Sequence, residues 1–433
     1  MIAFFPGTVI SPQPQRHWYF GWNVVAACSI LTLFTVGLRL GVGPLFLPIA
    51  TDLGFTRSTL SAVIAVGMLF YGIGMPLGGY LVKVLHTRAV VLLGAVCVLT
   101  ALLWTVNTTS IVGFIFAFGI LLSIGLSFIS PTAFAPLVLR WFVKKRGAAV
   151  FYLSTGGVAG IAVITPLLNF MVENLGWRNS LILYGIGLAS LTTLMGIFII
   201  REPRASDGDE DTSQTLVNTP RKDNRTPSSP SPSVPHYTAI QAIKTRPFWI
   251  IVIGMLASGY SINLLGVHGV PMLVDHGFSP MMASAGIGVI GITGIISTIV
   301  LSQLADRVQR RKLLATIYFI RAVGFVGLLL ATTDLQLIIV AIIGGSVWAG
   351  NVAMATAILA DLYGVRLVGL LFGWTYLGHQ IVGMISSWLG GWAYEQLHTH
   401  WPVFGFGALS LVVAAYYSWI LPNTNHTAPK AVR

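Results

Sequence analysis

Acidic residues are scarce in this chain, with 13 Asp and Glu in 433 residues against 25 Lys and Arg. Charged residues make up only 9% of the sequence and hydrophobic residues 55%, a composition that excludes a soluble globular domain. Apolar runs of about 20 residues are each long enough to cross a bilayer as a helix. The sequence lacks the alternating segments of about ten residues that mark a membrane β-barrel. It therefore predicts an all-α polytopic membrane protein.

Groups that carry enzyme chemistry are also few. The two cysteines, Cys28 and Cys97, fall inside apolar runs, which predicts buried free thiols and no disulfide framework. No predicted span has Asp or Glu in its interior, and no His-Glu-x-x-His motif occurs. The pattern Gly286-Ile-Gly288-Val-Ile-Gly291 matches a dinucleotide fingerprint, but it has no strand before it and predicts helix packing instead. We expect no catalytic residue, no metal site and no cofactor.

One long polar segment, residues 201–246, separates two apolar parts of the chain. Its acidic, basic and Ser/Pro-rich stretches cannot bury enough apolar surface to offset ordering entropy, so we expect a disordered linker. The predicted organisation is an N-terminal segment (1–20), a six-helix half (21–200), the linker (201–246), a second six-helix half (247–421) and a tail (422–433). The twelve predicted spans are about 21–48, 58–82, 88–107, 110–139, 147–173, 179–200, 247–274, 281–304, 312–332, 335–361, 366–396 and 401–421.

Lysine and arginine are unevenly distributed over the loops between these spans. With the N-terminus in the cytoplasm, nearly all loop cations lie on the cytoplasmic side, and only Arg57 and Arg178 lie on the outer side. Because positive charge in short loops marks the cytoplasmic side, we predict a plasma (inner) membrane protein with both termini and the linker in the cytoplasm. The net charge of +12 then reflects topology and not nucleic-acid binding.

The loop between the eighth and ninth spans reads Ser302-Gln303-Leu304-Ala305-Asp306-Arg307-Val308-Gln309-Arg310-Arg311. It resembles the Gly-x-Leu-Ala-Asp-Arg-x-Gly-Arg-Arg signature of the major facilitator superfamily, in which two halves rock about a central site. The corresponding first-half loop, residues 79–88, keeps the spacing but has Lys83 at the acidic position. The resemblance implies a cytoplasmic gate that includes Asp306, Arg307, Arg311, Arg140 and Arg146. The alternative, that these loops only set topology, stays open.

The junction of spans 4 and 5 reads Phe142-Val143-Lys144-Lys145-Arg146-Gly147-Ala148-Ala149. It is similar to the Phe-x-x-(Arg/Lys)-Arg-x-x-Ala signature of monocarboxylate transporters and their bacterial relatives, which include oxalate/formate antiporters. The resemblance implies transport of small organic carboxylates, often together with protons. The charged pair that animal members carry in span 8 falls near Gly294 and Thr298 and does not carry over. The span 11 lysine of the antiporters falls on or next to His379.

Basic groups inside the predicted spans suit an anion. Arg39 should face a polar cavity, because an arginine at mid-membrane costs about 2.5–3.5 kcal/mol, and its fork matches a carboxylate. His379 is suited to hold a carboxylate or to couple a proton. The alternatives are an arginine bonded to backbone carbonyls and a neutral histidine bonded to a neighbouring helix. Further predicted substrate contacts are Tyr71, Asn263, His268, Asn351 and Gln380, and Arg321 is predicted to be a structural charge within the membrane.

These observations favour a secondary active transporter for a small organic anion that works as a monomer by alternating access. Proton symport and anion exchange both stay open. A carrier that exports a larger or uncharged metabolite is the alternative within transporters. A transporter-like membrane sensor is the alternative of another class, although the linker and tail hold no sizeable signalling domain.

Overall fold

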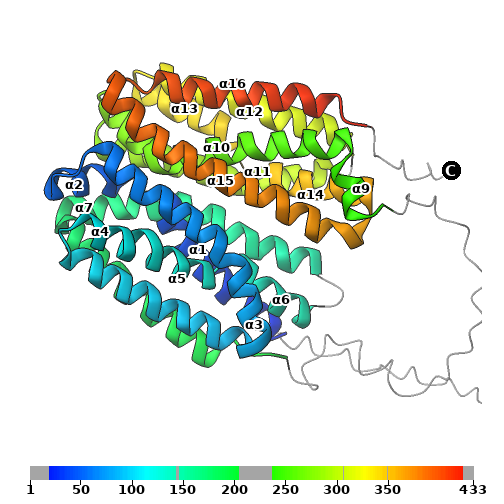
Figure 1. Cartoon of the computed structure of the whole chain (residues 1–433), viewed down its shortest axis with the longest axis horizontal. Coiled ribbons are helices and arrows are strands. Elements are labelled where there is room, and N and C mark those ends of the chain that lie inside the picture. Colours follow the sequence, from blue (N-terminus) through cyan, green and yellow to red (C-terminus); the bar gives the residue numbers. More distant parts are fainter. Residues whose placement is uncertain (1–18, 143–145, 204–236, 306, 349, 423–433) are drawn as a thin grey trace, which may run out of the picture.

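The computed structural model describes residues 19–142, 146–203, 237–305, 307–348 and 350–422. Most of the expected N-terminal segment, linker and tail lies outside these ranges. Within them the chain forms helices and turns and no strand (Figure 1). Nine of the described helical segments are long and apolar enough to cross a membrane. The prediction of an all-α polytopic fold is confirmed.

The first part of the chain contains two very long helices. Its elements are α1 (Gly21–Leu40), α2 (Gly43–Leu53), α3 (Arg57–Asn107), α4 (Ile111–Phe114), the π-helix η1 (Ile115–Leu121), α5 (Leu122–Phe128), α6 (Pro131–Trp141) and α7 (Arg146–Phe198). α3 and α7 have 51 and 53 residues, more than twice the roughly 20 that one crossing needs. Each is broken at one residue of positive φ, His86 at 67° and Gly176 at 74°. Each is thus long enough for two crossings, and the total of twelve stays a prediction.

The second part begins earlier along the chain than the sequence suggested. Its elements are α9 (Ala239–Ile243), α10 (Arg246–Asp275), α11 (Pro280–Ala305), α12 (Arg310–Leu330), α13 (Asp334–Gly345), α14 (Gly350–Tyr363), α15 (Val365–Leu397) and α16 (Trp401–Trp419). α9 lies inside the stretch expected to be a disordered linker. A reciprocal capping box between Thr238 and Gln241 satisfies its first backbone donors. This local signal stabilises a helical turn where average composition predicted none.

Two of the crossing segments are interrupted near their middle. The α5–α6 break at Ile129 and Ser130 precedes Pro131, as expected from the proline. The α13–α14 break follows Gly344 and Gly345 and contains no proline. A broken helix frees carbonyl groups that other parts of the protein must satisfy inside a membrane. The Thr35 hydroxyl does so at the first break, donating to the Ile129 carbonyl at 2.8 Å.

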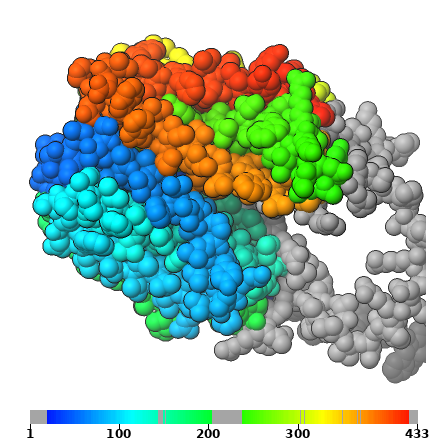
Figure 2. All heavy atoms as spheres, viewed as in Figure 1, coloured from blue at the N-terminus to red at the C-terminus, as the bar shows by residue number. Residues whose placement is uncertain are grey.

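Buried apolar side chains form two large clusters. One runs from Val24 to Ile200 and includes Val267, and the other runs from Ala242 to Leu421 and includes Leu40 and Ile161. Figure 2 shows the corresponding lobes, the lower one running from blue to green and the upper one from bright green to red. Each part of the chain therefore has its own core, and we refer to the two lobes as the first and second halves.

Glycines bring the backbones of the two halves close together. A Cβ added to Gly291 on α11 would lie 2.4 Å from the amide nitrogen of Ala162 on α7. One added to Gly391 on α15 would lie 2.0 Å from the Ser61 hydroxyl on α3. We call the end at which α2 and Arg57 lie the Arg57 end, and the end at which residues 203 and 237 lie the linker end. The halves converge at the Arg57 end and diverge toward the linker end (Figure 1).

Candidate functional site

Arg39, near the end of α1, connects the two halves at the centre of the protein. One of its terminal nitrogens donates to the Asn263 side-chain oxygen on α10 at 3.0 Å and to that of Gln380 on α15 at 3.3 Å. The guanidinium also lies 4.2 Å from the centre of the Tyr71 ring and contacts the sulfur of Met68 at 3.2 Å, both on α3. The sequence prediction placed four of these five residues at one site, and the structure brings them together.

The positive charge of Arg39 has no carboxylate partner among the described residues. Its Nε is buried without a hydrogen-bond partner, and so is the side-chain nitrogen of Gln380. Leaving a buried donor unpaired costs about 1–3 kcal/mol. Two unpaired donors and an uncompensated cation in one place form a site with the chemistry to bind an oxyanion.

His379 lies beside this site on α15. Its Nδ1 is 3.3 Å from the Gln380 side-chain oxygen, the same oxygen that accepts from Arg39. Its ring stacks on Tyr376, with centroids 5.1 Å apart and planes 8° apart. The α15 backbone at His379 also lies close to α10. Gly259 on α10 permits this contact, because a Cβ there would lie 2.2 Å from the His379 carbonyl oxygen. Arg39, Gln380 and His379 therefore form one polar chain from the first half into the second.

A small, partly open space adjoins Arg39 inside the first half. It has a volume of about 40 Å³ and is lined by Leu38, Arg39, Val42, Ile64, Gly67, Met68, Phe118, Leu122, Ser123 and Leu126. Apart from the guanidinium and the Ser123 hydroxyl, every lining side chain is apolar. The cavity thus places an apolar compartment directly beside the cation.

Arg321 on α12 forms a separate polar cluster in the second half and is only 1% exposed. It donates to the Ser258 hydroxyl and the Asn351 side-chain oxygen at 3.1 Å each, and to the backbone carbonyls of Val347 and Trp348. Those carbonyls belong to the α13–α14 break. Asn351 in turn donates to Ser258 at 2.6 Å, so both ends of its amide are used. These contacts fit the structural role predicted for Arg321 and place Asn351 with it, apart from Arg39.

Replacing Arg321 by methionine is expected to destabilise the protein by about 2–3 kcal/mol. The reason is that the carbonyl oxygens of Val347 and Trp348 and the amide of Asn351 would lose a buried charged donor. The measurement is thermal unfolding of the purified protein in detergent. The matched control is Arg307→Met, which removes an exposed arginine. Equal unfolding temperatures for both variants would contradict the structural role.

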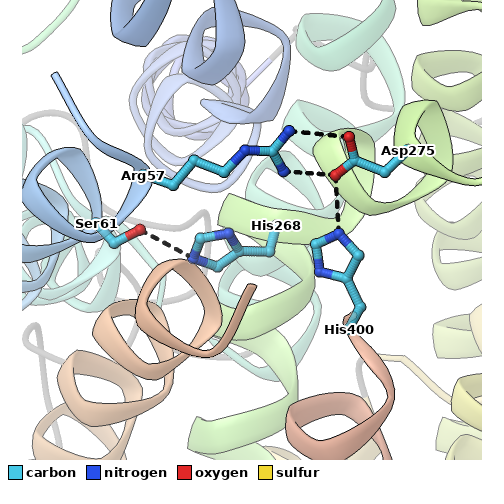
Figure 3. Close-up of polar contacts among 5 residues, drawn as sticks. All are labelled: Arg57, Ser61, His268, Asp275 and His400. Atoms are coloured by element: carbon cyan, nitrogen blue, oxygen red, sulfur yellow. Dashed lines mark hydrogen bonds and ion pairs between the residues drawn. The ribbon is translucent and has the colours of Figure 1, made fainter. Parts of the chain in front are cut away.

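A third polar cluster joins the halves at the Arg57 end (Figure 3). Arg57 on α3 forms a two-point ion pair with Asp275 on α10, at 2.5 and 2.9 Å. Nε2 of His400 lies 2.9 Å from the same carboxylate. Arg57 also lies 3.9 Å from the centre of the Tyr394 ring, and the Glu395 carboxylate accepts from the Ser58 amide at 3.0 Å. We call these residues the closure cluster.

His268 lies near the closure cluster and not at Arg39. Its Nε2 is 2.7 Å from the Ser387 carbonyl oxygen on α15 and 3.4 Å from the Ser61 hydroxyl on α3. Because a carbonyl only accepts, His268 donates through this nitrogen. Figure 3 shows it pointing toward Ser61 alongside the Arg57–Asp275 pair. Its side chain thus connects the halves between the central site and the Arg57 end.

The predicted gate residues are only partly within the described part of the chain. Asp306 and the side chain of Arg146 lie outside it. Arg307 is exposed, Arg311 donates to the Leu421 carbonyl at 2.9 Å, and Arg140 pairs with Glu202 at 2.8 Å. Glu202 also accepts from Thr87, near the loop in which Lys83 replaces the acidic residue. A further pair, Arg310 with Asp361 at 2.6 Å, joins α12 to α14. Each of these contacts joins residues of the same half, and none links the two halves.

A family model described as the Major Facilitator Superfamily matches residues 25–354 and 291–432 of the chain. The chain belongs to the major facilitator superfamily. Monocarboxylate transporter 12-B of Danio rerio is 24% identical over 419 residues, covering 92% of this chain and 86% of that protein. Human monocarboxylate transporter 11 is 23% identical, covering 85% and 73%. An uncharacterized MFS-type transporter, YcxA, of Bacillus subtilis (strain 168) is 23% identical, covering 89% and 90%.

The crystal structure of a D-xylose–proton symporter shares the major facilitator fold of this chain. The TM-score is 0.69 at 16% sequence identity, and the match covers 94% of this chain and 99% of that one. The prediction of a major facilitator transporter related to monocarboxylate transporters is confirmed by these comparisons. Proteins of this superfamily are transporters and not enzymes, which agrees with the sequence prediction.

Sequence reasoning missed three features of these sites. Met68 contacts Arg39, and Tyr376 stacks on His379. Neither was predicted, because an apolar or aromatic residue inside a membrane span usually indicates helix packing. Ser258 likewise gave no signal, although Arg321 and Asn351 both bond to it. The closure cluster carried a detectable signal, since Arg57 and Asp275 are opposite charges at predicted span ends.

Proposed function

We propose that this superfamily member is a secondary active carrier of small organic anions, chiefly monocarboxylates. The observation that carries the proposal is the Arg39 site, a partly buried cation between the halves with buried unpaired donors and no carboxylate partner among the described residues. A carboxylate supplies oxygen acceptors to both unpaired donors and neutralises the charge. Relatives that are named monocarboxylate transporters support the same substrate class.

In the proposed mechanism, the Arg39 site opens alternately to either side of the membrane. The Arg57 end is the outer end, following the predicted topology, and the closure cluster holds it shut while the linker end is open to the cytoplasm. Breaking the Arg57–Asp275 pair and the contacts of His268 with Ser61 lets the halves rock the other way. His379 is the group in the site that is suited to take up a proton from the substrate side.

Uptake by proteoliposomes that contain the purified protein tests the proposal. Labelled lactate, pyruvate, oxalate and a longer carboxylate are each supplied with and without an inward proton gradient. Saturable uptake of a carboxylate supports the proposal. Stimulation by the gradient indicates symport, and a requirement for internal substrate indicates exchange. Absence of carboxylate uptake by folded protein would disprove it and turn attention to uncharged metabolites.

A further inference from the structure

The cavity beside Arg39 has the size of a short alkyl group. A water-sized probe needs about 10–15 Å³, and a cavity of about 150 Å³ holds a benzene molecule. Scaled from a cavity that holds the six carbons of benzene, the 40 Å³ available here fits about one or two carbon atoms. Because its lining is apolar except for Arg39 and Ser123, filling it with hydrocarbon is favourable, whereas water would find few partners.

The guanidinium and the apolar space form one continuous amphipathic site. Arg39 lines the cavity and also contacts Asn263 and Gln380, and Met68 lines the cavity while touching the Arg39 guanidinium. A carboxylate that binds Arg39 therefore has a place for its tail on the first-half side. A ligand with a charged head and a short apolar tail matches both features at once.

The cavity walls are closely packed and resist expansion. A Cβ added to Gly67 on α3 would lie 2.8 Å from the Ser123 hydroxyl and 3.2 Å from the Gly119 carbonyl oxygen, so the backbones of α3 and η1 are near contact. Phe118 belongs to the π-helical turn η1 and stacks on Phe114 at 5.3 Å. Such turns occur often at functional sites, because the wider turn redirects side chains. A rigid wall gives a sharp limit on tail length.

We infer that this cavity receives the alkyl end of the transported carboxylate and that Phe118 sets the longest chain carried. The inference rests on the proposed function and adds the substrate class, monocarboxylates with tails of about one or two carbons. It also assigns the discrimination of chain length to residues of the first half alone.

The test compares uptake of acetate, propionate, butyrate and hexanoate by proteoliposomes. Phe118→Leu widens the cavity and is expected to raise hexanoate uptake relative to propionate roughly tenfold, the usual scale for one or two methylenes. Leu122→Phe fills the cavity and is expected to lower propionate uptake by a similar factor relative to acetate. Phe116→Leu is the matched control, since Phe116 lies in the same π-helix and is 51% exposed.

Three different results overturn the inference. Wild-type uptake of propionate with the same chain-length profile in all variants would exclude the cavity while leaving the proposed function in place. No saturable uptake of any carboxylate by the wild type would disprove the proposed function and this inference with it. A profile shifted equally by Phe116→Leu would also count against the cavity, because that side chain does not line it.

Discussion

Arg39→Gln is expected to lower carboxylate uptake by roughly 100-fold or more while the protein stays folded. The substitution removes the cation that faces Asn263 and Gln380 and the planar fork that matches a carboxylate. Two charged hydrogen bonds, at about 1.5–3 kcal/mol each, account for a loss of this size. Arg39→Lys is expected to restore only part of the rate, because lysine keeps the charge without the fork.

Initial uptake rates in proteoliposomes, normalised to folded protein, measure this effect. The matched control is Arg178→Gln, which removes a first-half cation that pairs with Asp52 at the Arg57 end. Carboxylate uptake that survives Arg39→Gln would show that the carboxylate binds elsewhere and that Arg39 does not have the proposed role.

Asp275→Asn is expected to open the Arg57 end. The Asp275 side chain is 14% exposed, accepts hydrogen bonds from Arg57 and lies against His400. Removing its negative charge therefore leaves Arg57 and His400 without this anionic partner. A partly buried pair of this kind supports a shift of about 1–2 kcal/mol, or roughly five- to thirty-fold in the ratio of closed to open protein. If the halves move as rigid bodies, the linker end closes as the Arg57 end opens.

Spin labels at Thr109 and Leu335, one on each half, report this change as a longer distance in pulsed electron resonance. Both positions are exposed, and Cys28 and Cys97 are first replaced by serine. Asp52→Asn is the control, because the Asp52–Arg178 pair lies within one half and should leave the distance unchanged. Identical distance distributions in Asp275→Asn and the unsubstituted protein would show that the closure cluster does not hold this end.

The fold followed from composition and from the length of the apolar runs, because a membrane admits few backbone arrangements. Arg39 and His379 were predicted as site residues because basic groups are rare inside membrane spans, where a charge is costly. His86 and Gly176 fall in the expected loops between spans, residues 83–87 and 174–178. The α13–α14 break was missed because no proline marks it, and its stability depends on Arg321 from another helix.

The closure cluster shows why loop charges alone were insufficient. Arg57 and Asp275 are 218 positions apart, and His400 is another 125 beyond Asp275. A count of loop cations predicts the side of the membrane on which Arg57 lies, but it does not predict which residue pairs with Arg57. The pairing depends on how the halves pack, and spacing along the chain does not encode that. The sequence prediction placed His268 at the substrate site, whereas the structure places it nearer the Arg57 end. Position along a membrane span alone does not show which groups of the other half a side chain contacts.

The neutral partners of Arg39 have an electrical consequence. Asn263 and Gln380 accept from the guanidinium without cancelling its charge, so the empty site carries one net positive charge and a site loaded with a monoanion carries none. A change of access moves the empty site through part of the transmembrane voltage, where a full elementary charge is worth about 2.3 kcal/mol per 100 mV. Membrane voltage should therefore act on the return of the empty carrier, while the loaded carrier crosses with little response to it.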